Sequence, residues 1–200
     1  MSHKLESLSL KTLATSSVFV PSVFRVSPLV RAALWTLYLA LMLPMPFLVQ
    51  LNPSLDFPLG WIALGLLVGG ILLEMALSEQ VHLSEEGLSV RYPWWVPSQF
   101  RRGWSLRWPE VTDLKARSTG QGGLVYYLVS QERDGFLLPM RVVGFHRMLG
   151  LIQIKTGINT QDVKPLAQPW MYATLLGVSL LLLIADGWIL STAWNNLGGI

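Results

Sequence analysis

Two acidic side chains are candidates for chemistry because each lies in a long apolar stretch. Glu74 lies near the end of residues 58–77, and Asp186 lies within residues 170–193. An ionisable group inside a membrane is costly to bury, so such groups commonly mark ion, proton or ligand pathways. We therefore treat both residues as candidate intramembrane polar sites. The alternative for each is a place at the membrane interface without a chemical role.

A second candidate is the proline-bounded segment 92–104. Tryptophan and arginine are the residues that most often anchor protein interfaces, and amphipathic side chains also suit the headgroup layer of a membrane. Pro93 and Pro97 remove two backbone donors and disfavour a central strand. The segment predicts an exposed docking surface for a partner or for lipid headgroups; the alternative is that its aromatic side chains pack on the domain's own sheet. The candidate residues are Trp94, Trp95, Phe100, Arg101, Arg102 and Trp104.

The rest of the sequence shows no pattern typical of an enzyme or a metal protein. The histidines, His3, His82 and His146, lack the spacing of a zinc site. Cysteine is absent, which excludes disulfides, thiol catalysis and cysteine-bound metals. The glycine run 120–123 lacks the lysine of a phosphate-binding loop and predicts a hairpin turn. We therefore expect no enzyme activity, no cofactor and no metal.

Three apolar stretches must position these residues. They cover residues 32–49, 58–77 and 170–193, and about 20 apolar residues match a hydrocarbon core about 30 Å thick. The whole chain of 200 residues is 14% charged, against about 25% in ordinary soluble domains. The sequence thus predicts three transmembrane helices. Pro44 and Pro46 predict a kink in the first, and the spacing of Gly65 and Gly69 predicts close helix contact.

The positive charges indicate an orientation. All 15 lysine and arginine residues lie in residues 1–31 and 79–166. By the positive-inside rule, both regions face the cytoplasm or the stroma. The net charge of +3 is small and indicates topology; we expect no nucleic-acid partner. The expected division of the chain is an N-terminal segment 1–30, a transmembrane hairpin 31–78, a soluble domain 79–166, a third span 167–194 and a tail 195–200.

The soluble domain reads as short strands followed by one helix. Residues 81–83 and 88–92 flank a turn and predict a β-hairpin, and residues 104–108, 111–116, 124–129 and 136–138 predict further strands. Phe145, Met148, Leu149 and Ile152 have the spacing of an amphipathic helix, which Gly157 is expected to end. The expected fold class is α+β, with one helix on an antiparallel sheet, carried by three transmembrane helices.

Two short stretches, residues 83–90 (LSEEGLSV) and 106–111 (LRWPEV), carry a resemblance. They resemble the bacterial pleckstrin-homology-like (PH-like) domains found beside membrane spans. That resemblance implies an antiparallel sheet closed by a C-terminal helix. Two spans ahead of such a domain are also similar in architecture to the photosystem I assembly factor of thylakoids. The third span of this chain departs from that pattern. The tryptophan-rich stretch at 94–108 resembles small cyanobacterial and plastid membrane proteins.

The resemblance implies a non-enzymatic integral membrane scaffold that assists photosystem biogenesis. Its expected partners are membrane lipid and a membrane protein complex such as photosystem subunits. Its expected location is the thylakoid or plasma membrane, with the soluble domain on the cytoplasmic or stromal side. The residues also leave a second possibility open, an accessory subunit of a membrane enzyme or transporter that uses Glu74 and Asp186.

Overall fold

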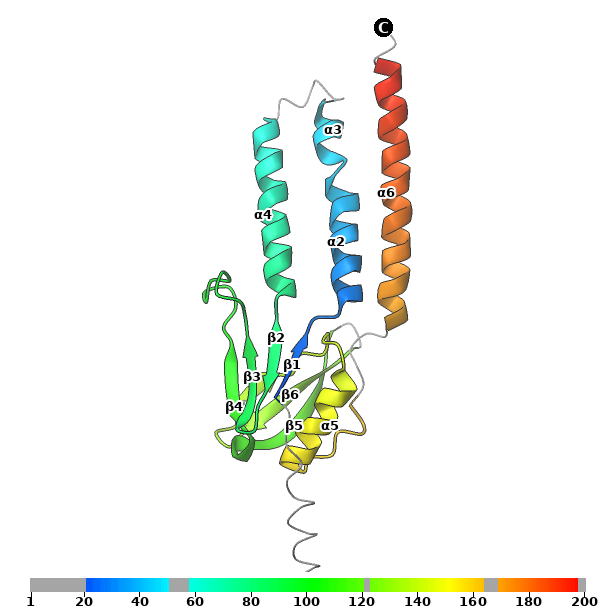
Figure 1. Ribbon diagram of the computed structural model, residues 1–200. Helices are drawn as coiled ribbons and strands as arrows, with labels where there is room; N and C mark the ends of the chain where they lie inside the picture. The colour runs from blue at the N-terminus through cyan, green and yellow to red at the C-terminus, as the bar shows by residue number, and fades with distance from the viewer. Residues whose placement is uncertain (1–20, 51–57, 121–122, 164–168, 198–200) are drawn as a thin grey trace, which may run out of the picture.

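The computed structural model describes residues 21–50, 58–120, 123–163 and 169–197. Helices stand side by side, and a domain of strands and one helix lies below them (Figure 1). The strands are β1 (Ser22–Arg25), β2 (Gln80–Leu83), β3 (Gly87–Arg91), β4 (Trp104–Arg107), β5 (Val111–Ser118), β6 (Leu124–Ser130) and β7 (Gly135–Leu137). The helices are α2 (Pro28–Met42), α3 (Met45–Gln50), α4 (Leu59–Leu77), α5 (Phe145–Thr156) and α6 (Pro169–Leu197), and a 3₁₀ turn covers Trp108–Glu110.

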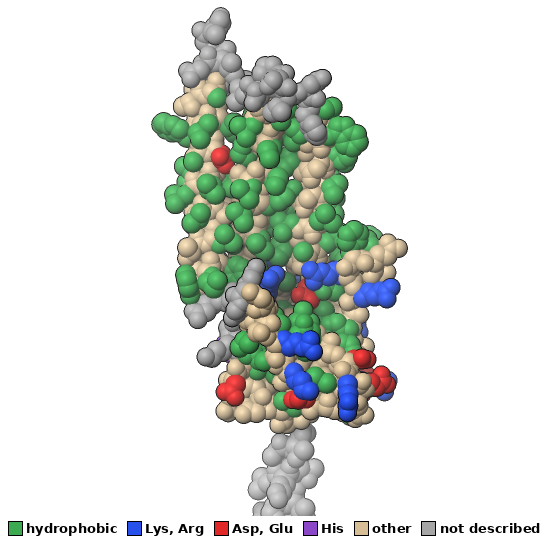
Figure 2. Space-filling view, turned by 180° about the vertical axis from the view of Figure 1, so that it is seen from behind, with side chains coloured by type: hydrophobic (Ala, Val, Ile, Leu, Met, Phe, Trp, Pro, Cys, Tyr) green, Lys and Arg blue, Asp and Glu red, His purple; other side chains and the backbone are tan. Residues whose placement is uncertain are grey.

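Among the described residues, three helical segments are long and apolar enough to cross a membrane: Pro28–Gln50, Leu59–Leu77 and Pro169–Ala193. Hydrophobic side chains cover them in Figure 2, whereas lysine and arginine side chains gather at their base and on the domain. The first segment is broken between α2 and α3, at Leu43 and Pro44. Proline lacks an N–H and its ring clashes with the preceding turn, so the predicted kink is present as a break.

Helix α2 packs against α6 and also touches α4. Ala33 and Ala40 are buried on α2, and small residues let helix backbones approach closely. On α4, a Cβ atom added at Gly69 would lie 2.8 Å from the Tyr38 hydroxyl oxygen. Gly65 has no such neighbour within 4 Å. The predicted close contact therefore holds at Gly69 only, because the aromatic side chains of α2 fill the gap at that level.

The domain consists of two antiparallel sheets around one core. The sheet orders are β1-β2-β3-β4 and β5-β6-β7, and α5 contributes Met148 and Ile152 to the buried cluster. Val81 pairs with Val90 and Leu83 with Leu88 across the β2–β3 hairpin, as the sequence predicts. The amphipathic helix is also confirmed as α5, and it ends at Gly157 in the left-handed conformation (φ 73°), which glycine adopts readily.

Strand β1 was not expected, because the sequence places residues 1–30 outside the domain. It pairs with β2 in an antiparallel register that sets Phe24 opposite Val81, and Phe24 is buried in the core. Only Val26 and Ser27 separate β1 from α2, and only Ser78 and Glu79 separate α4 from β2. The domain is therefore joined to two helices through adjacent strands of one sheet, with almost no linker.

Candidate functional site

The loop between β3 and β4, residues 92–103, is called the Trp-Arg loop below. Two turns shape it, and each opens at a proline. The Val96 N–H donates to the Pro93 carbonyl at 3.0 Å, and the Phe100 N–H donates to the Pro97 carbonyl at 3.0 Å. Because proline restricts φ to about −65°, both turns start from a constrained backbone. The segment thus leaves the sheet, as the two prolines predict.

The Trp-Arg loop presents large apolar side chains to its surroundings. Trp94 is 96% exposed, Phe100 is 65% exposed and Trp95 is 37% exposed. Arg101 and Arg102 are exposed as well. Contiguous aromatic side chains outside the core are a feature of surfaces that bind a partner or a membrane. The structure therefore exposes all five of these residues on one loop.

The base of the loop is tied to the domain. The Tyr92 hydroxyl donates to Glu79 Oε1 at 2.9 Å, and the Arg101 guanidinium carbon lies 6.0 Å from the centroid of the Tyr92 ring. Burial and then the charge of Glu79 raise the pKa of Tyr92, which keeps its hydroxyl a donor. At the other end, a Cβ atom added at Gly103 would lie 2.5 Å from the Val90 carbonyl oxygen. Only glycine fits this close approach of the two strands.

Trp104 packs with the core and not with the exposed part of the loop. It is the first residue of β4, where its side chain lies on the same face as the buried Leu106. Its ring centroid lies 5.1 Å from that of Phe136, and both rings pack against the buried cluster. Side chains alternate between the two faces of a strand, so entry into β4 turns Trp104 inward. Trp104 therefore packs on the domain's own sheet and does not belong to the exposed docking surface that the sequence predicts for this segment.

The Trp-Arg loop rises from the sheet on the side that carries the helices. Figure 1 shows it reaching the level of the lower end of α4. Because α4 is long and apolar enough to cross a membrane, the loop lies beside the point where such a helix would leave the bilayer. Tryptophan and arginine side chains are favoured at that depth.

Glu74 links α4 to α2 at the end nearest the domain. Its carboxylate forms an ion pair with Arg31 and accepts a hydrogen bond from Trp35 Nε1 at 3.0 Å. The Arg31 and Glu74 side chains are 45% and 30% exposed. Both oxygens of the carboxylate are thus engaged by α2. The geometry gives Glu74 a role in holding two helices together.

Asp186 lies past the midpoint of α6, on the half away from the domain. Its side chain is half-buried, and no ion pair of the described residues includes it. Glu74 lies in the last turn of α4, close to the domain. The structure therefore does not bring the two acidic residues into one site.

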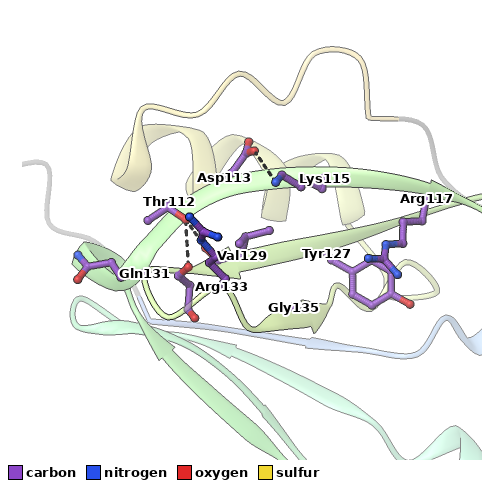
Figure 3. A pocket seen from close by; sticks show the side chains of 10 residues that line it. Thr112, Asp113, Lys115, Arg117, Tyr127, Val129, Gln131, Arg133 and Gly135 are labelled. Atoms are coloured by element: carbon purple, nitrogen blue, oxygen red, sulfur yellow. Dashed lines mark hydrogen bonds and ion pairs between the residues drawn. The ribbon is translucent and has the colours of Figure 1, made fainter.

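A polar hollow of about 740 Å³ on the outer face of the β5-β6-β7 sheet was not identified from the sequence (Figure 3). Asp113, Lys115 and Arg117 alternate along β5 and share this face. Lys115 Nζ lies 3.9 Å from Asp113 Oδ2, and the Arg117 guanidinium carbon lies 5.8 Å from the Tyr127 ring centroid. Arg133 adds a further cation from a left-handed turn (φ 68°). The charged residues at every second position, 113, 115 and 117, are the sequence signal that indicates this face.

The two histidines in the part of the chain that the structure describes lie in different elements. His82 lies in β2, where burial, Arg91 and Arg25, in that order, lower its pKa. His146 lies in the first turn of α5, and His3 lies outside the described residues. Within the described ranges, no group of three His, Cys, Asp or Glu side chains is placed to hold a metal ion.

Comparison with known proteins identifies a cyanobacterial relative. It is named "Uncharacterized protein slr0269", from Synechocystis sp., and is 49% identical over 175 residues, which are 87% of this chain and 88% of the relative. No family model matches the chain, and no solved structure matches it. Identity at this level along most of both sequences establishes common descent. The chain therefore belongs to the same family as this cyanobacterial protein.

Proposed function

We propose that the chain is a non-enzymatic integral membrane scaffold that assists the assembly of a membrane protein complex, with the Trp-Arg loop as its docking surface. The observation that carries this proposal is the exposure of Trp94 and Phe100 on a loop that reaches the level of the lower end of α4 (Figure 1). Exposed aromatic side chains are costly in water, and at this place a membrane-embedded partner is within reach. Arg101 and Arg102 add charged contacts for an acidic partner surface or for headgroups.

The anchoring part of the proposal rests on the three apolar helices. The domain then lies on the cytoplasmic or stromal face, as the distribution of lysine and arginine indicates. Two antiparallel sheets with α5 at the C-terminal end agree with the PH-like architecture that the resemblance implies. Because β1 and β2 lead almost directly into α2 and α4, the domain and its loop are held at a constant distance from the membrane.

The client that we propose is a photosystem complex in the thylakoid membrane. Two observations support this choice: the resemblance to photosystem I assembly factors and the cyanobacterial origin of the relative. The rival class, an accessory subunit that uses Glu74 and Asp186, is less well supported, because Arg31 and Trp35 already engage Glu74. Replacement of Asp186 by asparagine tests whether Asp186 has the role that the rival gives it. Only the rival requires that this replacement abolish activity.

The docking test uses Synechocystis in which this chain, carrying a tag, replaces the relative. The double variant Trp94→Ser with Phe100→Ser is compared with Ile154→Ser, which alters a side chain on α5 that is 74% exposed. We expect equal protein abundance in all strains and loss of co-purified photosystem subunits in the loop variant only. Photosystem content in that strain should fall to the level of a deletion strain. Normal photosystem content in the deletion strain itself would overturn the photosystem assignment.

The orientation is tested by single cysteines, because the natural chain has none. Glu132→Cys places a thiol on an exposed turn of the domain, and Asn195→Cys places one near the end of α6. In sealed vesicles with the cytoplasmic face outward, a membrane-impermeant maleimide should label the first variant and spare the second. Labelling of the second variant alone would show that the orientation is the reverse of the one proposed. Labelling of both would place the two sites on the same face, so α6 would not cross the membrane.

A further inference from the structure

A cavity of about 350 Å³ lies where the helices join the domain. Its walls come from the first turns of α2 and α6 and from residues 140–146, which lead into α5. The Ser27 N–H donates to the Arg141 carbonyl at 3.0 Å, and the Val143 N–H donates to the Arg25 carbonyl at 2.9 Å. These bonds fix one wall of the cavity against β1. Its volume is in the range of small-molecule sites, about 300–1,000 Å³.

The lining of this junction cavity combines an apolar surface with basic side chains. Its apolar wall includes Leu29, Val30 and Tyr172. Arg141 and His146 also line it, and none of the described lining residues is acidic. Arg141 is exposed, and its side chain takes part in no ion pair of the described residues. A surface of this kind is complementary to a ligand that is apolar at one end and anionic at the other.

We propose that the junction cavity binds one anionic lipid. The headgroup lies at Arg141 and His146, and the first carbons of the acyl chains lie against Leu29, Val30 and Tyr172. This inference rests on the membrane anchorage in the proposed function, but it concerns a different surface from the Trp-Arg loop.

The position of the cavity favours a lipid over a soluble anion. Leu29 and Val30 lie in the first turn of α2, and Tyr172 lies in the first turn of α6. Both helices belong to segments that are apolar enough to cross a membrane. The apolar wall therefore continues into the surface that acyl chains would cover, so a lipid can occupy the cavity without leaving the bilayer. A soluble phosphate would leave this wall in contact with water, which is unfavourable.

The experiment uses the full chain, reconstituted in vesicles of equal parts phosphatidylglycerol and phosphatidylcholine and then examined by native mass spectrometry. We expect the wild-type chain to retain phosphatidylglycerol about tenfold or more over phosphatidylcholine, as one charge-assisted contact allows. Arg141→Gln should abolish the preference. Arg133→Gln is an equal charge change on the β5-β6-β7 face, outside the lining of this cavity, and should preserve it. Val143→Trp, which enlarges an exposed lining side chain, should reduce retention of both lipids.

Three results of the lipid measurements would overturn the proposal. They are equal retention of the two lipids by the wild-type chain, an Arg141→Gln variant that behaves like Arg133→Gln, and displacement of phosphatidylglycerol by glycerol phosphate at equal concentration. The last result would indicate a soluble anion site. Extraction of the wild-type chain from membranes by alkaline carbonate would refute the anchorage and the lipid site together. Resistance to extraction without a lipid preference would refute the lipid site alone.

Discussion

The contact between Glu74 and α2 yields a quantitative prediction about how the helices are held together. One carboxylate oxygen pairs with Arg31, and the other accepts from Trp35 Nε1 at 3.0 Å. A partly exposed ion pair contributes about 0.2–1 kcal/mol, and a hydrogen bond to a charged group contributes about 1.5–3 kcal/mol. Glu74→Ala removes both, so we expect the free energy of unfolding to fall by about 2–4 kcal/mol. Glu74→Gln keeps one acceptor and should lose less.

The measurement is reversible unfolding of the full chain in mixed micelles with increasing SDS, followed by tryptophan fluorescence. A double-mutant cycle of Arg31→Met and Glu74→Gln isolates the pair, and we expect a coupling energy of about 0.5–3 kcal/mol. Asp186→Asn is the matched control, because it neutralises an acid in an apolar helix without breaking an ion pair of the described residues. It should leave stability unchanged or raise it, since an unpaired charge there is unfavourable.

Two results would refute this reasoning about Glu74. Additivity of Arg31→Met and Glu74→Gln within about 0.3 kcal/mol would show that the pair contributes nothing to folding. A loss in Asp186→Asn as large as that in Glu74→Ala would show that any neutralised acid in these helices destabilises the chain, with no special part for the contact between α2 and α4.

Three further predictions use the same unfolding assay. Trp104→Ala should lower the free energy of unfolding by about 3 kcal/mol because the ring packs on the core. Trp94→Ala should change it by less than about 0.5 kcal/mol. Equal losses would contradict the assignment of Trp104 to the core and of Trp94 to the exposed loop. Gly69→Val should cost about 1–3 kcal/mol through contact with Tyr38, and Gly65→Val, with open space around it, should not. Because the pKa of His82 is lowered from 6.5 in the folded chain, the unfolded chain binds more protons in mild acid. Stability should therefore fall as the pH drops below about 6.5, and His82→Gln should flatten this dependence.

Elements whose pattern lies in residues close together in the chain could be predicted from the sequence. The apolar stretches end within a few residues of α4 and α6, and Pro44 breaks the first segment where it was expected to bend. The hairpin of β2 and β3 and the amphipathic helix α5 follow from the alternation and spacing of their own apolar residues. In each case the signal lies within one element, so no distant contact is needed to recognise it.

The membership of β1 in the sheet could not be predicted in that way. Its four residues, Ser22–Arg25, form a strand only because β2 offers an edge, and β2 begins more than 50 residues further along the chain. The polar hollow of Figure 3 is an intermediate case: the spacing of Asp113, Lys115 and Arg117 indicates their common face of β5, but the contact of Arg117 with Tyr127 depends on the pairing of β5 with β6. Pairing of this kind is set by the whole domain, not by local propensity.

The candidate site shows the same division between sequence and structure. The sequence alone determined that residues 92–104 form a proline-bounded, aromatic and basic segment and that two acids lie in apolar helices. Only the tertiary structure decided that Trp94 faces outward while Trp104 packs inward, and that Glu74 is paired whereas Asp186 lies at another level. The partners Arg31 and Glu74 are 43 positions apart. Whether a side chain is exposed or paired depends on such distant neighbours, which only the packing of the folded chain brings together.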